Sequence, residues 1–281
     1  GINIYNARAS YFTYISGINV QSSPLAKNYI MDFLYSDGLM WSSSKGGIHI
    51  FKTSDKSFVP FEIINGELPT KQVTQLVEDS KRNIWFSTFD GEIYKMNRVG
   101  DRYSIENKIS RKDTERGVRW NEILTMTKDD RDNFWIGGDN SGLNYFDTNS
   151  NTVISFGGTN GNSGGLYTNS VRSVYIDNTG LVWIGTFNKG IYLVNNNTGK
   201  FDSYQLGEFQ RNELDGKDAL AFAEDKKGNV WITYDGVGLV ILDKKTNSLK
   251  RQDQINKKIS PLIITTLTFD NDEHLWVGTA G

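Results

Sequence analysis

The chain has 281 residues, of which 37% are hydrophobic and 12% aromatic, and its formal net charge is −2. This near-neutral balance gives no general attraction to nucleic acid or to an anionic membrane surface, so we expect no nucleic-acid contact by this region. The absence of Cys excludes disulfides, thiolate metal sites and a cysteine nucleophile. No apolar run approaches the ~20 residues that span a bilayer. Because Gly1 falls inside a repeat, we expect the chain to be part of a longer protein.

Six tryptophans recur at nearly equal spacing along the chain. In order they are Trp41, Trp85, Trp135, Trp183, Trp231 and Trp276, and the differences between successive positions are 44, 50, 48, 48 and 45. A period of this size is typical of propellers and other repeat architectures. The abundance of Gly, with 28 residues, and the scarcity of Pro, with 4, favour many short strands joined by tight turns.

The clearest copy of the repeat runs from Val171 to Tyr204 and predicts four strands. Turn sequences of the Asn-x-Gly type separate these strands, and such residues tolerate the positive φ that tight hairpins require. The strands are predicted at Val171–Asp177, Leu181–Phe187, Ile191–Asn195 and Lys200–Tyr204.

Two further positions repeat with the tryptophans. Six residues before the Trp, five of the six copies have an Asp, which can accept hydrogen bonds from turn amides two residues on. These residues are Asp79, Asp129, Asp177, Asp225 and Asp270. Two residues after the Trp, on the same strand face, every copy has a small residue, as in Gly137 and Gly185. A large ring beside a small neighbour suits sheets packed face to face, so we predict that the tryptophans form the core between blades.

The fold class predicted by the repeat is an all-β propeller of four-stranded antiparallel blades, forming a single domain over residues 1–281. The chain ends after two strands, Ile264–Asp270 and Leu275–Thr279, and starts with two more, Gly1–Asn6 and Tyr11–Ile15. Five whole blades plus these two halves make six, and pairing of the halves would close the ring and remove its sheet edges. The alternative is an arc of a seven-bladed propeller.

The repeats resemble those of the two-component regulator propeller family. The resemblance rests on an acidic-x-x-Gly turn, then Trp-Ile-Gly-Thr, then Gly-Leu or Gly-Ile and an Asn/Asp-rich turn. It is seen in IDNTGLVWIGTFNKGIYLVNNNTGKF and in EDKKGNVWITYDGVGLVILDKKTNSL. The resemblance extends over all six copies, and it favours a seven-bladed ring because propellers of this family usually have about seven blades.

The family resemblance implies a function that the repeat pattern alone does not. Such propellers form the periplasmic sensor of hybrid two-component systems in Bacteroides-type bacteria and detect oligosaccharides. The resemblance therefore implies a non-catalytic carbohydrate-sensing domain of an inner-membrane histidine kinase. It also implies an adjacent propeller, an immunoglobulin-like domain and homodimerisation through the complete sensor.

The sequence contains little of the chemistry that an enzyme needs. Its two histidines, His49 and His274, occupy repeat positions, so we predict structural roles for both and no catalytic residues. The run Asp129–Asn133 lacks the central Gly and the distal Glu of a calcium loop, and we expect neither a metal nor a cofactor. The Asp-x-x-Gly-x-x-Trp turn is similar to the Asp-box of sialidases, which is a folding device and not a catalytic one.

Candidate ligand-binding residues occur where the repeats differ. The turn position four residues after the Trp varies in charge and size, and polar or aromatic residues lie beside it, as sugar binding requires. These candidates are Lys45, Phe89, Asp90, Asp139, Asn140, Phe187, Asn188, Tyr234 and Asp235. The loops that lead into each first strand also differ, at 19–29, 62–72, 103–122, 157–170, 205–218 and 252–262. Variable loops on one face are typical of a binding surface, although loops also vary without function.

Trp120 is the tryptophan outside the repeat, in a segment rich in basic residues. One interpretation is a sugar-stacking platform flanked by Arg116 and Arg119; the other is a ring that caps its own blade. Two other function classes remain open for the whole chain. One is a secreted propeller enzyme, a polysaccharide lyase or a glycosidase. The other is a propeller that binds a partner protein.

Overall fold

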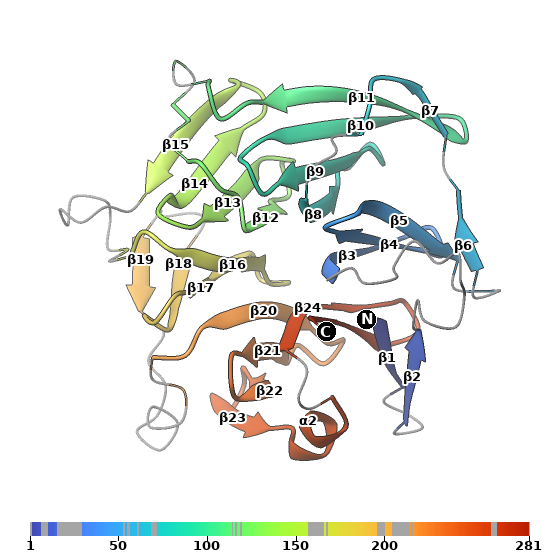
Figure 1. The fold of residues 1–281 in the computed structure, drawn as a ribbon. Coiled ribbons are helices and arrows are strands. Elements are labelled where there is room, and N and C mark those ends of the chain that lie inside the picture. Colours follow the sequence, from blue (N-terminus) through green and yellow to red (C-terminus); the bar gives the residue numbers. More distant parts are fainter. Residues whose placement is uncertain are drawn as a thin grey trace.

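The structure is a computed structural model that describes residues 2–6, 11–15, 30–52, 54, 57–60, 62–68, 72–113, 115, 117–118, 120–156, 166, 168–195, 200–203, 214, 216–259 and 263–280. Its described strands form six sheets arranged around a central axis (Figure 1). Five sheets are built from consecutive strands, and the sixth combines strands from both ends of the chain. The all-β propeller prediction is therefore confirmed.

We number the blades in chain order, beginning with the first complete one. Blade 1 contains β3 (Ile30–Ser36), β4 (Leu39–Ser44), β5 (Gly47–Lys52) and β6 (Ser57–Val59). Blade 2 contains β8 (Val73–Glu78), β9 (Ile84–Thr88), β10 (Ile93–Val99), β11 (Arg102–Ile109) and an added outer strand, β7 (Glu62–Asn65). Blade 3 contains β12 (Thr125–Lys128), β13 (Phe134–Gly138), β14 (Gly142–Asp147) and β15 (Thr152–Phe156).

The remaining blades follow the same order from the axis outward. Blade 4 contains β16 (Val171–Ile176), β17 (Leu181–Thr186), β18 (Ile191–Asn195) and β19 (Lys200–Ser203). Its four strands lie within one residue of the predicted ones. Blade 5 contains β20 (Ala219–Glu224), β21 (Val230–Tyr234), β22 (Gly238–Asp243) and β23 (Ser248–Arg251). Blade 6 contains β24 (Ile263–Phe269), β25 (His274–Ala280), β1 (Ile2–Asn6) and β2 (Tyr11–Ile15).

The ring closes with six blades among the described strands. β1 pairs antiparallel with β25, so that Ile4 lies opposite Trp276. The inner strands contact one another in the order β3, β8, β12, β16, β20 and β24, and β24 contacts β3 again. The alternative of a seven-bladed arc is therefore wrong, because the two half blades pair with each other and leave no gap in this circuit.

The repeated tryptophans lie between blades, as predicted. Trp183 is packed with Ala219 and Phe222 of the following blade. A Cβ on Gly185, two residues after this Trp, would meet Ser173 and Ala219, so Gly at this position allows the inner strand of the next blade to approach.

In the blades that have it, the repeated Asp closes the first hairpin, and in four of them it also accepts a hydrogen bond from the Trp. Asp177 Oδ1 accepts hydrogen bonds from the amides of Thr179 at 2.9 Å and Leu181 at 3.1 Å, and its Oδ2 accepts one from Trp183 Nε1 at 3.0 Å. The same Trp-to-Asp bond is present in three other blades, from Trp85 to Asp79, Trp231 to Asp225 and Trp276 to Asp270. We call the propeller face that carries these hairpins the box face.

Three segments that we predicted as loops contain regular structure. Residues 62–72 include β7, which pairs in parallel with β11 and covers the outer edge of blade 2. Residues 103–122 include most of β11. Residues 252–262 include helix α2 (Asp253–Ile259), whose Ile255 and Ile259 are buried against blades 5 and 6. Asp253 in its first turn and Lys258 in its last turn match the helix dipole.

Candidate functional site

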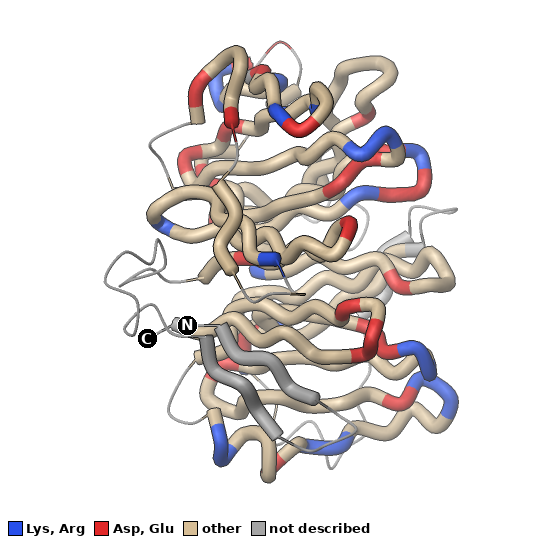
Figure 2. Tube along the Cα trace, turned by 90° about the vertical axis from the view of Figure 1, so that its right-hand side faces the viewer, with Lys and Arg blue, Asp and Glu red and all other residues tan. Residues whose placement is uncertain are grey.

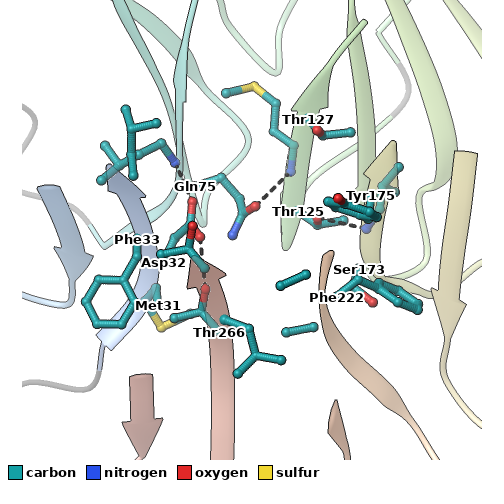
Figure 3. A pocket seen from close by; sticks show the side chains of 18 of the residues that line it. Met31, Asp32, Phe33, Gln75, Thr125, Thr127, Ser173, Tyr175, Phe222 and Thr266 are labelled. Carbon is teal, nitrogen blue, oxygen red and sulfur yellow. Dashed lines mark hydrogen bonds between the residues drawn. The ribbon is translucent and has the colours of Figure 1, made fainter. Parts of the chain in front are cut away.

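A channel runs through the centre of the ring, with a cavity of about 630 Å³ between the six inner strands (Figure 3). Each inner strand pairs with its own blade on one side only, so its other edge faces the channel. Backbone N–H groups on such an edge need partners from elsewhere. Side chains of neighbouring blades supply several of them.

These side chains belong to one repeat position on the inner strands, opposite the small residue that follows the Trp by two. The position holds Asp32, Gln75, Thr125, Ser173, Ala221 and Thr266, which we call the channel ring. Three members accept a hydrogen bond from a backbone N–H of the next blade: Asp32 from Leu76 at 2.9 Å, Gln75 from Met126 at 3.5 Å, and Thr125 from Val174 at 3.1 Å (Figure 3). The channel ring therefore links blades 1 to 4 through specific hydrogen bonds.

Asp32 is the ionisable member of the channel ring. Its second carboxylate oxygen accepts a hydrogen bond from the Thr266 hydroxyl at 3.0 Å, so its carboxylate joins blades 6, 1 and 2 (Figure 3). Burial raises the pKa of Asp32 from 3.8 to about 7, although hydrogen bonds from Leu76, Phe33 and Thr266 act in the opposite direction. This carboxyl group therefore titrates near neutral pH.

Arg172 lies at the channel mouth, at the β-bulge where β16 departs from its pairing with β17. Its guanidinium lies 4.9 Å from the centre of the Phe187 ring, and its Nε lies 3.6 Å from Asp218 Oδ2. Asp218 Oδ1 accepts a hydrogen bond from the Asn188 amide at 3.1 Å. We call these four residues the mouth cluster. It combines an aromatic face, a cation and a carboxylate that accepts a hydrogen bond from a backbone amide.

The turns between second and third strands share the mouth face with the segments that lead into the inner strands. Phe89, Phe187 and Asp235 each donate a backbone hydrogen bond to the residue just before a first strand of the same blade, which confirms this arrangement. Phe187 is 44% exposed and Phe89 37% exposed. Lys45, Asn140, Asn188 and Asp235 are also exposed, and Asp90 and Asp139 are half-buried.

The structure brings together only some of the predicted site residues. Phe187 and Asn188 meet in the mouth cluster. Asp139 instead accepts a hydrogen bond from the Ser170 hydroxyl at 2.6 Å, and Asp90 accepts one from Thr88 at 2.7 Å. The prediction for Tyr234 needs correction, because its side chain is 3% exposed and packs in the core with Trp183.

Trp120 is a core residue. It is 2% exposed, packs with Trp85, Ile123 and Phe134, and donates its Nε1 hydrogen to the Gly91 carbonyl at 3.2 Å. A ring enclosed in this way has no face free for a sugar. The burial of the ring between blades 2 and 3 agrees with a core role and not with the stacking platform. Arg116 and Arg119, the predicted flanking residues, lie outside the described residues.

Sequence reasoning missed Arg172, Asp218 and the channel ring. The sequence contained one signal for the ring, since Asp32 stands at a repeat position held elsewhere by Gln, Thr, Ser and Ala. Arg172 occupies the β-bulge between Val171 and Ser173, where the pairing register shifts by one residue. An alignment of the repeats by strand position therefore does not single out Arg172.

Both histidines and several acidic residues in the described part of the chain have structural partners. His49 Nε2 lies 3.1 Å from Ser44 Oγ, and His274 Nδ1 lies 3.0 Å from Asp270 Oδ2. Burial lowers the pKa of His49. Glu78 accepts a hydrogen bond from Ser36 at 2.6 Å, and Glu224 accepts one from Lys244 at 2.6 Å. The residues that the structure describes contain no group of His, Cys, Asp or Glu arranged for a metal ion.

The fold and the mouth cluster define a six-bladed β-propeller with its variable turns around one end of a central channel. Two segments of the chain, residues 67–90 and 168–188, match the model of the two component regulator propeller family. No match was found among curated protein sequences. Within the described residues, no helix has the length and apolar character needed to cross a bilayer.

Solved structures of the same fold include extracellular domains of two-component systems. The extracellular domain of a protein named as a hybrid two-component system of B. thetaiotaomicron matches with a TM-score of 0.66 and 22% identity over 97% of this chain and 35% of that one. A second such domain matches with 0.66 and 17% over 95% and 33%. The chain therefore spans about a third of the length of these proteins. A streptogramin B lyase also matches, with 0.61 and 14% over 99% and 94%. At these identities the likeness shows the fold alone.

Proposed function

We propose that this propeller is the ligand-sensing part of an extracytoplasmic two-component sensor and that it binds an oligosaccharide at the channel mouth without transforming it. The observation that carries the proposal is the mouth cluster. The half-exposed Phe187 ring supplies a flat apolar face, while Arg172 and Asp218 supply hydrogen-bonding groups beside it. Sugar rings need this combination, since they present apolar C–H faces edged by hydroxyls.

A sensing role is also supported by the way the acidic groups of the channel are used. Glycoside hydrolysis needs two carboxyl groups placed on either side of the scissile bond. In the described channel, Asp32 uses both oxygens to join blades, while Glu78 and Glu224 are bound by side chains near the box face. We therefore propose that the region is non-catalytic and that ligand binding changes its conformation.

The family repeats and the sensor structures of the same fold support the wider setting of this proposal. In that setting the propeller belongs to a periplasmic sensor of an inner-membrane histidine kinase. It adjoins a second propeller and an immunoglobulin-like domain and dimerises through the complete sensor. The same setting requires no cofactor.

Isothermal titration calorimetry with a panel of plant and host oligosaccharides tests the binding role. Phe187→Ala and Arg172→Ala should each weaken binding of the oligosaccharide that binds by roughly tenfold or more, about 1.4 kcal/mol. Phe89→Ala is the matched control, because Phe89 has a similar exposure at the equivalent turn of another blade. It should change affinity by no more than about twofold.

Two results would reject the proposal. One is binding that survives both mouth variants unchanged. The other is the release of shortened or unsaturated sugar products during incubation, because this would assign the chain to the lyase or glycosidase class.

A further inference from the structure

Blade 3 departs from the hydrogen bonding of the other boxes. Asp129 Oδ1 accepts the usual turn amides, from Arg131 and Asn133, both at 2.9 Å. Its Oδ2, however, accepts a hydrogen bond from the Tyr145 hydroxyl at 2.7 Å instead of from Trp135. Tyr145 lies directly opposite Trp135 on the neighbouring strand, where Leu193 lies opposite Trp183 in blade 4. The tyrosine hydroxyl thus takes the acceptor that the indole has elsewhere.

The consequence is a buried donor without a partner. Trp135 is 4% exposed, and its Nε1 has no hydrogen-bond partner in the structure, whereas Trp85, Trp183, Trp231 and Trp276 donate to their Asp. An unsatisfied buried N–H is unfavourable, and native proteins almost always provide such a group with an acceptor. The acceptor for Trp135 must come from outside the described side chains.

A cavity of about 640 Å³ lies beside this donor on the box face, between the hairpins of blades 3 and 4. Trp135, Tyr145 and Phe156 form one aromatic wall, with the Trp135 ring centre 4.9 Å from that of Tyr145 and 5.7 Å from that of Phe156. Asp130 and Asn178 lie on the exposed rim. Cavities of this size hold small-molecule ligands.

The chemistry of the cavity narrows the kind of ligand. The Trp135 Nε1 hydrogen requires a hydrogen-bond acceptor and does not coordinate a cation. The cavity lining carries three carboxylates, Asp129, Asp130 and Asp177, and one cation, Arg131. Lys244 Nζ lies 3.1 Å from Asp177, and the remaining negative excess disfavours an anionic ligand. A neutral ring with hydroxyls satisfies all these groups. Figure 2 shows that segments with Asp, Glu, Lys and Arg are frequent along one side of the ring.

We propose that this cavity is a second carbohydrate subsite that holds one neutral sugar residue, with a sugar oxygen accepting the Trp135 Nε1 hydrogen. The sugar ring packs against the aromatic wall, and its hydroxyls donate to Asp130 and Asn178 at the rim. The site lies on the box face, opposite to the mouth cluster, and it does not depend on ligand binding at the mouth.

Indole ¹⁵N NMR tests this site directly. The Trp135 signal is identified as the one missing from Trp135→Phe, and the protein is then titrated with glucose, galactose, mannose, maltose and cellobiose. At least one of these sugars should move the Trp135 signal and leave those of the six other tryptophans in place. If none moves it, the donor is served by water alone and the proposal is overturned.

Tyr145→Phe provides a sharper second variant. Removing the hydroxyl frees Asp129 Oδ2, so Trp135 can form the same bond as Trp183 does with Asp177. We expect the apparent sugar affinity to fall at least tenfold while the fold is retained. Tyr175→Phe is the control. Tyr175 lies opposite Trp183 on the first strand of blade 4, whereas Tyr145 lies opposite Trp135 on the third strand of blade 3, and Tyr175 does not line this cavity. It should leave the response of Trp135 unchanged.

Two further measurements separate this proposal from the others. Trp183→Phe breaks the bond to Asp177, whereas Trp135→Phe breaks none, so the melting temperature should fall further for Trp183→Phe. Equal losses would mean that Trp135 has an acceptor inside the protein, which contradicts the site. Arg172→Ala should leave the Trp135 response intact even if it abolishes binding at the mouth. Loss of the Trp135 response in that variant would also contradict an independent site.

Discussion

Replacing Asp32 by Asn tests the reasoning about the channel ring. Because burial raises the pKa of Asp32 from 3.8 to about 7, the folded protein binds this proton more tightly than the unfolded chain does. The stabilisation from this group is complete below about pH 4 and is lost as the pH rises through about 7. Asn removes this dependence and keeps both contacts, since its oxygen can accept from Leu76 and its amide can donate to Thr266.

The magnitude follows from the size of the pKa change. The rise from 3.8 to about 7 is about 3 pKa units, which corresponds to about 4 kcal/mol at 1.36 kcal/mol per unit. Solvent in the channel reaches part of the side chain, so we expect roughly half of this, about 2 kcal/mol. Asp32→Asn should therefore be more stable than the wild type by about 2 kcal/mol at pH 8 and nearly equal to it at pH 4.

Urea denaturation of both proteins between pH 4 and pH 8 measures this difference. The comparison with wild type at each pH is needed because burial lowers the pKa of His49, which makes stability rise with pH over part of the same range. Asp101→Asn, at an exposed turn, is the control and should follow the wild type at every pH. A variant that is less stable than wild type at pH 8, or one with an unchanged pH slope, would refute the argument.

Four further variants test the core and the links between blades. Trp183→Ala should lower the free energy of unfolding by about 3–5 kcal/mol in urea denaturation, and an unchanged midpoint would contradict the inter-blade packing. Trp120→Ala should also lower the free energy of unfolding by about 3–5 kcal/mol and leave oligosaccharide affinity in calorimetry unchanged. Unchanged stability with weaker binding would instead place Trp120 in the binding surface. Gly185→Ala should destabilise the protein by about 1–3 kcal/mol, because its Cβ would meet Ser173 and Ala219. A melting temperature equal to that of the wild type would show that blades 4 and 5 can move apart to accept the methyl group. Lys244→Met should cost about 2 kcal/mol, since it leaves Asp177 and Glu224 without their shared cation. The loss should persist in high salt, because the two carboxylate side chains are 1% and 5% exposed.

Much of the fold could be predicted because the residues that form each blade recur in several copies of the repeat. The Trp, the Asp six residues earlier and the small residue two residues later depend on contacts within one blade and its neighbour, and each copy shows them again. Helix α2 was missed because it forms through burial of Ile255 and Ile259 against blades 5 and 6, which no repeat position describes. The number of blades was left open because ring closure depends on the fit of the whole circuit.

The candidate site was less predictable than the fold. Phe187 and Asn188 could be found because their turn position varies among repeats while the strands do not. Arg172 and Asp218 come from different blades, and only the assembled ring brings them together. For Trp120 the sequence suggested a possible binding residue where the structure has a core residue. A ring outside the repeat can still fill a space in the core, here next to Gly91 and Trp85.

The most direct measurement is a crystal structure of the chain with the oligosaccharide that calorimetry selects. The account predicts intact sugar at the channel mouth, with one ring against Phe187 and hydroxyls bound by Arg172 and Asp218. Sugar bound only outside the mouth, or density for a cleaved product in the channel, would contradict the proposal that this propeller senses an oligosaccharide through its mouth cluster.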